Sequence, residues 1–231
     1  MRIDGLQKMT LLDYPGRVAC TLFTAGCNFR CPFCHNAPLV TRLDPAPAYT
    51  EEEILAFLQK RKGLLDGVAI TGGEPLLQPD ALSFIEKIKS LGYPVKLDTN
   101  GSFPDKLQTL VENGLVDYVA MDIKNSIAKY PATAGIPVSL MPQIEKSVAF
   151  LLSGKIDYEF RTTVTAEFHE INDFSEIGKW IRGAKRYFLQ PFVDSGDLVG
   201  TEPMHAPDEE TLNRMLQTVS PYVESVSVRG E

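Results

Sequence analysis

Short apolar runs rich in β-branched residues alternate along the chain with segments whose apolar residues recur every three or four positions. Continuous apolar runs of this length predict parallel strands covered on both faces, and the longer periodicity predicts amphipathic helices. Strands are expected near Val18–Thr24, Gly67–Thr71, Pro94–Asp98, Asp117–Asp122, Asp157–Val164 and Arg186–Gln190, with a short last strand near Val223–Val228. Helices are expected near Glu51–Lys62, Asp80–Leu91, Pro104–Asn113, Pro142–Ser153, Phe174–Arg182 and Asp208–Val219.

Two of the predicted helices begin at recognisable capping signals. Thr50 can cap the helix that starts at Glu51, and Glu53 completes a capping box. Ser102 is expected to cap the helix that starts at Pro104, a residue suited to a first turn. If Ser102 caps this helix, the nearby Asp98 is available for another role.

Six β–α repeats therefore cover nearly the whole chain, and no Ser/Gly-rich linker interrupts them. We expect one α/β domain over residues 1–231, folded as a partial (β/α)6 barrel of the TIM type, because six units are too few for the eightfold barrel. In such folds the chemistry lies where the strands end and the βα loops begin. The loop at residues 25–37, directly after the first predicted strand, occupies such a position.

The charge and hydropathy of the chain exclude some classes of partner. The 231 residues carry a net charge of −7, and no cluster of Lys and Arg stands out. Because phosphate neutralisation drives most nucleic-acid binding, this composition argues against DNA or RNA as the main partner. No apolar run approaches the roughly 20 residues that span a bilayer, and the N-terminus has no signal-peptide pattern. We expect a cytoplasmic protein with no membrane partner.

Three of the four cysteines, Cys27, Cys31 and Cys34, lie within eight residues. Thiolates at this spacing can surround one small metal centre, and sulfur ligands favour an iron–sulfur cluster or zinc. A structural zinc site needs a fourth ligand. His35 directly follows Cys34, which makes shared coordination awkward, and Cys20 lies in a predicted strand, where a buried cysteine behaves as a small hydrophobe. The spacing favours a reactive cluster with one open iron, while zinc and an electron-transfer cluster remain alternatives.

Three further motifs fall at the carboxyl ends of predicted strands. They are Thr71-Gly72-Gly73-Glu74-Pro75, Asp98-Thr99-Asn100-Gly101 and Ala120-Met121-Asp122-Ile123-Lys124. Two glycines let the backbone approach a ligand closely, and the acidic side chains supply charge beside it. Taken alone, the first motif would be an ordinary turn, and each Asp could be a helix cap. Their common position at strand ends is what indicates a site.

The cysteine motif, with Phe33 just before its last cysteine, resembles the signature of the radical S-adenosylmethionine (SAM) superfamily. The resemblance implies a full or partial (β/α) barrel and one oxygen-sensitive [4Fe–4S] cluster held by Cys27, Cys31 and Cys34. The open iron would bind the amino and carboxylate groups of SAM, and the backbone at Phe33 would meet the adenine.

The glycine and aspartate motifs extend this resemblance to the activases of glycyl radical enzymes. The resemblance implies that the methionine amino end is oriented by Gly72, Gly73 and Glu74. It also implies that Asp98 and Asp122 hold a monovalent cation beside the SAM carboxylate, which Lys124 reaches as well. Within the activases, the chain is similar to activators of anaerobic ribonucleoside-triphosphate reductase in the segments Asp13-Tyr14-Pro15-Gly16, Cys34-His35-Asn36, Tyr158–Val164 and Tyr187–Phe192.

The function implied by these resemblances is that of an anaerobic radical SAM activase. Reductive cleavage of SAM would yield a 5′-deoxyadenosyl radical, which would take a hydrogen atom from a glycine of the partner enzyme. The implied partner is an anaerobic ribonucleoside-triphosphate reductase, and the implied electron donor is flavodoxin or ferredoxin. Alternatives are an activator of a pyruvate formate-lyase type enzyme, a small-molecule radical SAM enzyme such as 7-carboxy-7-deazaguanine synthase, and a zinc or electron-transfer module.

Several other residues have less definite expectations. Arg161, a charge within a predicted strand, either faces the cofactor or pairs with an acid. Gln190 stands where pyruvate formate-lyase activators place a histidine for the ribose, so it is a speculative substitute. His169 and His205 are expected in surface loops without a role, and Trp180 is expected in the core.

Overall fold

The computed structural model describes residues 1–229, and its centre is one eight-stranded sheet. The strands lie side by side in chain order: β1 (Ile3–Thr10), β2 (Ala19–Thr24), β3 (Gly67–Gly72), β4 (Val95–Thr99), β5 (Tyr118–Asp122), β6 (Asp157–Val164), β7 (Tyr187–Pro191) and β8 (Val226–Val228). β1 runs antiparallel to β2, whereas every other neighbouring pair is parallel. The parallel strands expected from the sequence are confirmed.

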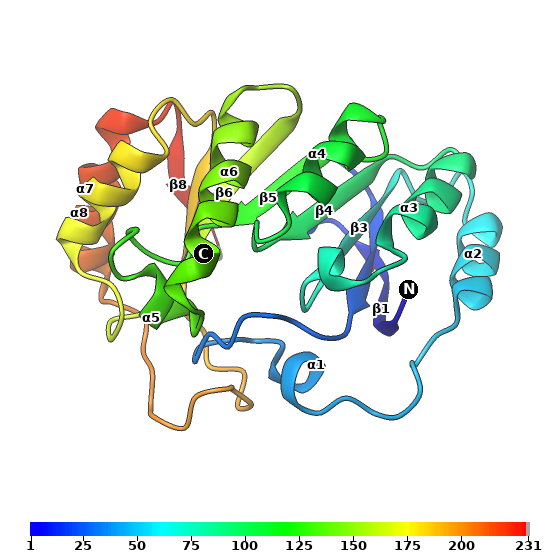
Figure 1. Cartoon of the computed structure of the whole chain (residues 1–231), viewed down its shortest axis with the longest axis horizontal. Coiled ribbons are helices and arrows are strands. Elements are labelled where there is room, and N and C mark those ends of the chain that lie inside the picture. The colour runs from blue at the N-terminus through cyan, green and yellow to red at the C-terminus, as the bar shows by residue number, and fades with distance from the viewer. Residues whose placement is uncertain (230–231) are drawn as a thin grey trace.

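Helices connect the parallel strands and flank the curved sheet (Figure 1). They are α1 (Ala37–Thr41), α2 (Glu51–Lys60), α3 (Ala81–Ser90), α4 (Pro104–Glu112), α5 (Tyr130–Ala134), α6 (Met141–Leu152), α7 (Ile171–Trp180) and α8 (Glu209–Val219). The six units that begin at β2 to β7 confirm the predicted partial barrel, whose sheet has β1 and β8 at its edges. Within residues 1–229, no helix combines the length and apolar character needed to cross a membrane.

One strand and two α-helices were not expected from the sequence. β1 is an edge strand whose pairing with β2 has two register irregularities, and most of its residues are at least partly exposed. The alternation of apolar and polar residues that marks a strand is therefore weak there. α1 and α5 have five residues each, too short for a helical periodicity to be visible.

The two predicted helix caps have different outcomes. Thr50 accepts a hydrogen bond from the Glu53 amide, and the Glu53 carboxylate accepts one from the Thr50 amide, so this capping box is confirmed. The prediction for Ser102 is wrong, because the residue before α4 is Phe103 and no side chain caps this helix. The Ser102 hydroxyl instead donates to Oδ1 of Asn100.

The concave face of the sheet differs from the expectation that both faces are apolar. Asp98 and Asp122, at the carboxyl ends of β4 and β5, and Arg161, within β6, line one cavity. Neighbouring residues on a strand point to opposite faces. The flanking residues of these strands are fully buried in the hydrophobic core: Leu97, Met121 and Phe160. The strands thus support a core on one face and charged groups on the other.

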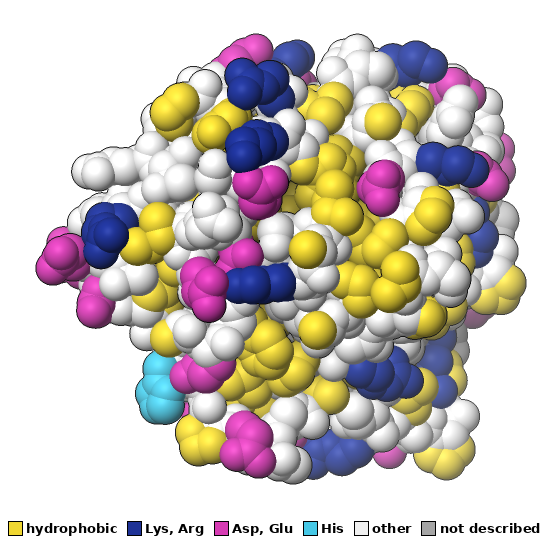
Figure 2. Space-filling model, turned by 60° about the vertical axis from the view of Figure 1, so that its left-hand side comes forward, with side chains coloured by type: hydrophobic (Ala, Val, Ile, Leu, Met, Phe, Trp, Pro, Cys, Tyr) yellow, Lys and Arg dark blue, Asp and Glu magenta, His cyan; other side chains and the backbone are white. Residues whose placement is uncertain are grey.

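Charges on the outer surface are mixed. On the face shown in Figure 2, Lys and Arg side chains are interspersed with Asp, Glu and hydrophobic side chains rather than gathered in one stripe. This distribution agrees with the charge balance of the sequence.

Candidate active site

A cavity of about 390 Å³ lies at the carboxyl ends of the parallel strands. Nine of the ten residues predicted for the site line it: Cys27, Cys31, Phe33, Cys34, Gly72, Gly73, Asp98, Asp122 and Lys124. Glu74 is the exception. Residues that are up to 97 positions apart in the sequence therefore meet at the edge where a (β/α) barrel places its chemistry.

The cysteine loop (residues 25–37) follows β2 and is held mainly by backbone contacts. The amide of Glu74 donates to the carbonyl of Gly26 over 2.8 Å, and the amide of Arg30 donates to the carbonyl of Ala134 over 2.9 Å. The loop is therefore fixed on one side by the segment after β3 and on the other by α5. In this arrangement the three cysteines of the loop line the cavity.

The thiols are largely withdrawn from water. Burial raises the pKa of Cys27 to about 11 and that of Cys31 to about 12, and it also raises the pKa of Cys34. The Lys124 ammonium opposes this shift in all three. Sγ of Cys27 accepts a hydrogen bond from the amide of Phe29 over 3.3 Å. Metal binding to such thiols releases protons, because the thiolate is the ligand.

The donor set fits a cluster better than a single zinc ion. A structural zinc site needs four side chains that converge on one ion. Among residues 1–229, no three His, Cys, Asp or Glu side chains are placed to hold one metal ion. A [4Fe–4S] cluster gives each thiolate its own iron, so its ligands surround a larger volume. Cys20 is fully buried in the core and does not line the cavity, which confirms its expected structural role.

The two glycines after β3 are required by close backbone contacts. Gly72 has φ +113°, and a Cβ there would lie 2.4 Å from the amide nitrogen of Thr24. A Cβ on Gly73 would lie 2.0 Å from the carbonyl oxygen of Gly26. A larger residue at Gly72 would clash with the end of β2, and one at Gly73 would push the cysteine loop away. The glycines therefore bring the cavity lining and the cysteine loop together.

Glu74 lies behind this lining and not in it. Its side chain is fully buried and accepts hydrogen bonds from the Leu76 amide, the Thr99 hydroxyl and the Asn100 amide. Burial outweighs these bonds and raises the pKa of Glu74 to about 7. The sequence analysis expected Glu74 to orient the methionine amino end. In the structure this carboxyl group braces the loops after β3 and β4, and its role at the methionine amino end stays a prediction.

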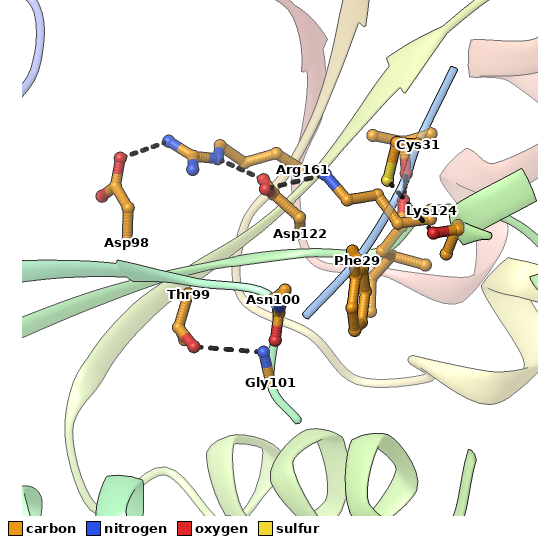
Figure 3. A network of polar contacts seen from close by, with 12 residues as sticks. Phe29, Cys31, Asp98, Thr99, Asn100, Gly101, Asp122, Lys124 and Arg161 are labelled. Atoms are coloured by element: carbon orange, nitrogen blue, oxygen red, sulfur yellow. Dashed lines mark hydrogen bonds and ion pairs between the residues drawn. The ribbon is translucent and has the colours of Figure 1, made fainter. Parts of the chain in front are cut away.

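Five charged side chains form a continuous line across the concave face, which we call the charged row: Lys96, Asp98, Arg161, Asp122 and Lys124. Nη1 of Arg161 donates to Asp98 over 3.0 Å, and its Nε donates to Asp122 over 2.9 Å (Figure 3). Lys124 Nζ donates to the other oxygen of Asp122 over 3.0 Å, and Lys96 Nζ donates to the other oxygen of Asp98. Arg161 thus faces the cavity and also pairs with two acids.

These contacts fix the protonation states of the charged row. Burial alone would raise the pKa of Asp122, but the Lys124 ammonium and the Arg161 guanidinium outweigh it and lower this pKa to about 2. The Arg161 and Lys96 cations likewise overcome the effect of burial at Asp98, whose pKa is lowered. Burial opposes the charge of Lys124, yet Asp122 raises the pKa of this ammonium. Asp98, Asp122, Lys124 and Arg161 are therefore charged at neutral pH.

The expectation for His169 is wrong. The side chain is only 3% exposed and packs against Phe33 and Phe174. Its Nδ1 accepts from the Thr165 amide, so Nε2 carries the proton and donates to the Lys124 carbonyl over 2.9 Å. His169 therefore connects the cysteine loop to the charged row. No sequence pattern indicates this burial, because a histidine in a polar loop segment looks like a surface residue.

Two other expectations agree with the structure. His205 is exposed and pairs with Glu167. Trp180 is partly buried against the core and contacts Tyr130 edge to face.

Several cavity residues carried no assigned role, or only a speculative one, in the sequence analysis. Asp13, His35, Asn36, Thr99, Asn100, Thr163 and Gln190 also line the cavity. Thr163 and Gln190 are paired in register on β6 and β7, so their side chains lie together on the concave face. The signal that could have found Thr163 is its position two residues after Arg161 on the same strand face.

Comparison with known proteins places the chain among described families. The model of the radical SAM superfamily matches residues 21–126. A protein of Methanocaldococcus jannaschii, provisionally named a glycyl-radical enzyme activating enzyme, is 30% identical over 98% of this chain and 95% of its own length. The pyruvate formate-lyase-activating enzyme of Clostridium pasteurianum is 35% identical over 54% of this chain, which spans about half (52%) of that relative.

Other similarities are broader. A 7-carboxy-7-deazaguanine synthase of Thermococcus kodakarensis is 32% identical over 72% of this chain and 71% of its own length. Among solved structures, Streptococcus suis SuiB bound to S-adenosylmethionine superposes with a TM-score of 0.68 at 15% identity. That match covers 90% of this chain and 49% of SuiB, and it supports the fold alone.

Proposed function

The chain belongs to the radical SAM superfamily and, within it, to the glycyl-radical enzyme activating enzymes, and from this premise we propose that it activates an anaerobic ribonucleoside-triphosphate reductase. Radical SAM enzymes use a [4Fe–4S] cluster and SAM, and activases of this kind act on a glycyl radical enzyme. The choice of partner is the step that goes beyond family membership.

One observation supports this choice of partner. The four segments whose sequences resemble reductase activators come from different parts of the chain, and each contributes to the cavity. They supply Asp13, Cys34, His35, Asn36, Arg161, Thr163 and Gln190. The resemblance is therefore concentrated where a substrate would be recognised, and not spread over the outer surface.

We assign the cluster and SAM to groups on opposite sides of this cavity. Cys27, Cys31 and Cys34 would hold the cluster. The backbone of Gly72 and Gly73 would face the methionine amino end, and the charged row would face its carboxylate end, with Asp98, Asp122 and Lys124 as the residues assigned from the sequence. The backbone at Phe33 would lie at the adenine.

The chain's own contribution is orientation, charge placement and exclusion of water. When bound, the reduced cluster and SAM supply the reductive cleavage of the S–C5′ bond and with it the power to remove a hydrogen atom from glycine. The charged row has a net charge of +1, so it suits an anionic carboxylate. Its ion pairs already exist before binding, and little reorganisation is needed. Phe33 and Phe168, packed together, keep one wall of the site apolar.

The test is activation of purified candidate partners under strictly anaerobic conditions. The reconstituted protein, SAM and a reductant are incubated separately with an anaerobic ribonucleoside-triphosphate reductase and with a pyruvate formate-lyase. We expect the glycyl doublet in electron paramagnetic resonance only with the reductase. A doublet only with pyruvate formate-lyase would transfer the proposal to that partner class and contradict ours.

A small-molecule reaction is the second candidate, because the similarity to a 7-carboxy-7-deazaguanine synthase covers 72% of the chain. Such an enzyme would consume its small substrate without any protein partner. Product formation from the pterin substrate of that reaction, together with no glycyl doublet for either protein, would favour this candidate.

A further inference from the structure

All four carboxylate oxygens of Asp98 and Asp122 are already bound to cationic side chains. Lys96 and Arg161 each take one oxygen of Asp98, and Arg161 and Lys124 each take one oxygen of Asp122. The Arg161 guanidinium bridges the two acids with two different nitrogens (Figure 3). The position between the acids, where the family resemblance implies a monovalent cation, is therefore filled by a side chain of the protein.

The charge balance of the row also argues against a bound monovalent cation. Three cations, Lys96, Arg161 and Lys124, face two carboxylates, which leaves one positive charge. A SAM carboxylate would neutralise this charge, whereas an added K⁺ or Na⁺ would bring the row to +2 before SAM binds. A further cation at this place is electrostatically unfavourable unless one of the side chains moves away.

The row also has a closed end and an open end. The side chain of Lys96 is 2% exposed and does not line the cavity, whereas that of Lys124 is 14% exposed and lines it. Lys124 stands at the open end, and within residues 1–229 its ammonium donates only to Asp122. An ammonium has three donors, so two remain for an incoming anion. The anion is thus expected to bind at Lys124, with Lys96 locked beneath Asp98.

We propose that Lys96 and Arg161 replace the monovalent cation expected between Asp98 and Asp122, so that SAM binds to this protein without added K⁺ or Na⁺. The proposal rests on the proposed function, since it assumes that SAM occupies the cavity. Lys96 acts here as a positioning residue: it holds the Asp98 carboxylate, which in turn holds Arg161. The residues of the row do not fit an additional metal ion.

The first test measures SAM binding to the reconstituted protein by equilibrium dialysis, in choline chloride and in equal concentrations of KCl or NaCl. We expect the same dissociation constant in all three salts. Binding that needs K⁺ or Na⁺, or is clearly tightened by either, would overturn the inference and leave the proposed function standing. Failure of SAM to bind in every salt would instead remove the proposed function, and this inference with it.

The second test asks whether removal of the lysine creates a cation site. Lys96→Met frees one oxygen of Asp98, and we expect weaker SAM binding in choline that KCl restores. Lys87→Met is the matched control, because Lys87 pairs with Glu51 at the surface and does not line the cavity. Its SAM affinity should not respond to the salt. An equal loss of SAM affinity for Lys96→Met in choline and in KCl would contradict the proposal that Lys96 takes the place of a cation.

Folding of the variant is controlled separately. Thermal unfolding of the cluster-free protein is followed in both salts, and K⁺ should stabilise Lys96→Met but not the wild type. Should Lys96→Met fail to fold, Lys96→Leu, which also frees this oxygen of Asp98, takes its place in the same assays. Indifference of this variant to K⁺ in both binding and unfolding would overturn the role of Lys96.

Discussion

The cysteine loop and the charged row lie on the same cavity, but they are built in opposite ways. The loop has no long regular element, and its three thiols have few partners among the described residues. In the charged row every carboxylate oxygen has a partner. The thiols of the loop therefore gain most of their bonds only when a metal cluster binds. The ion pairs of the charged row, in contrast, form within the protein before any ligand binds.

This difference predicts which property each region controls. Burial raises the pKa of the three thiols and so favours their protonated form. A thiol in this form can bind a metal only when the metal displaces its proton. Changes in the loop should therefore act on cluster content and much less on folding. A buried network of charges contributes to stability because each charge is paired with an opposite one. The loss of one member therefore leaves its partners buried without a counter-charge. Changes in the row should act on stability and on SAM binding, with the cluster retained.

The largest expected effect is the loss of the cluster from Cys31→Ala. Two thiolates are too few to hold a cubane, so iron content and SAM cleavage should fall to background, while the unfolding midpoint changes little. Anaerobic reconstitution followed by iron analysis and absorbance near 400 nm measures this. Cys20→Ala is the matched control and should keep its iron, because Cys20 lies in the core away from the cavity. Full iron in Cys31→Ala would contradict the ligand assignment.

The next effect is on stability, from Asp122→Asn. This change removes the negative charge between Arg161 and Lys124, and we expect a loss of about 3 kcal/mol, the lower end of the range for breaking a buried ion pair, because the side chain is partly exposed. SAM affinity should fall as well, with iron content unchanged. Urea unfolding and equilibrium dialysis measure both quantities.

A surface acid provides the control for this change. Glu176→Gln breaks an exposed pair with Lys179, and its effect should stay within about 0.5 kcal/mol. If Asp122→Asn lost its cluster but not its stability, the separation between the two regions would be wrong.

The parts predicted from the sequence are those governed by neighbouring residues. The parallel strands and the capping box at Thr50 follow from local patterns. The nine lining residues come from motifs at strand ends together with the family resemblance, and the order of these motifs along the strands brings them to one edge. Arg161 could not be assigned, because both its partners come from other strands. His169 was misplaced for the same reason, because Phe33, which is distant in sequence, packs against it.

Glu74 and His169 also connect the two regions that we compare. The amide of Glu74 supports the cysteine loop at Gly26, and its carboxyl group holds the segment that follows Asp98. Glu74→Gln replaces an acceptor with an amide that cannot accept all three hydrogen bonds. We expect a loss of about 1–3 kcal/mol, the cost of leaving a buried donor unsatisfied. Both cluster content and SAM affinity should decline, measured on the same reconstituted sample; a decline in only one would show that Glu74 serves one region.

The smallest expected effect is in the pH dependence of stability, where the two connecting residues have opposite signs. Burial raises the pKa of Glu74 to about 7, so its contribution is greatest below the unfolded value of 4.5 and declines as the pH rises through 7. Burial lowers the pKa of His169 below 6.5, so the unfolded chain binds a proton more readily than the native protein. The contribution of His169 is therefore present above pH 6.5 and is lost as the pH falls below it.

In the wild type these two contributions partly cancel between pH 4.5 and 7, and single substitutions should separate them. The unfolding free energy of His169→Gln should decrease as the pH rises through this window, and that of Glu74→Gln should increase. The half-buried His35 adds to the increase, because its pKa is also lowered by burial. The charged row should be silent in this window: the pKa of Asp122 is about 2, so its contribution is lost only between about pH 3.8 and 2. Urea unfolding of both variants across the window gives the two slopes. Parallel slopes would mean that neither side chain is buried as the structure has it, and that the cysteine loop and the charged row are connected in some other way.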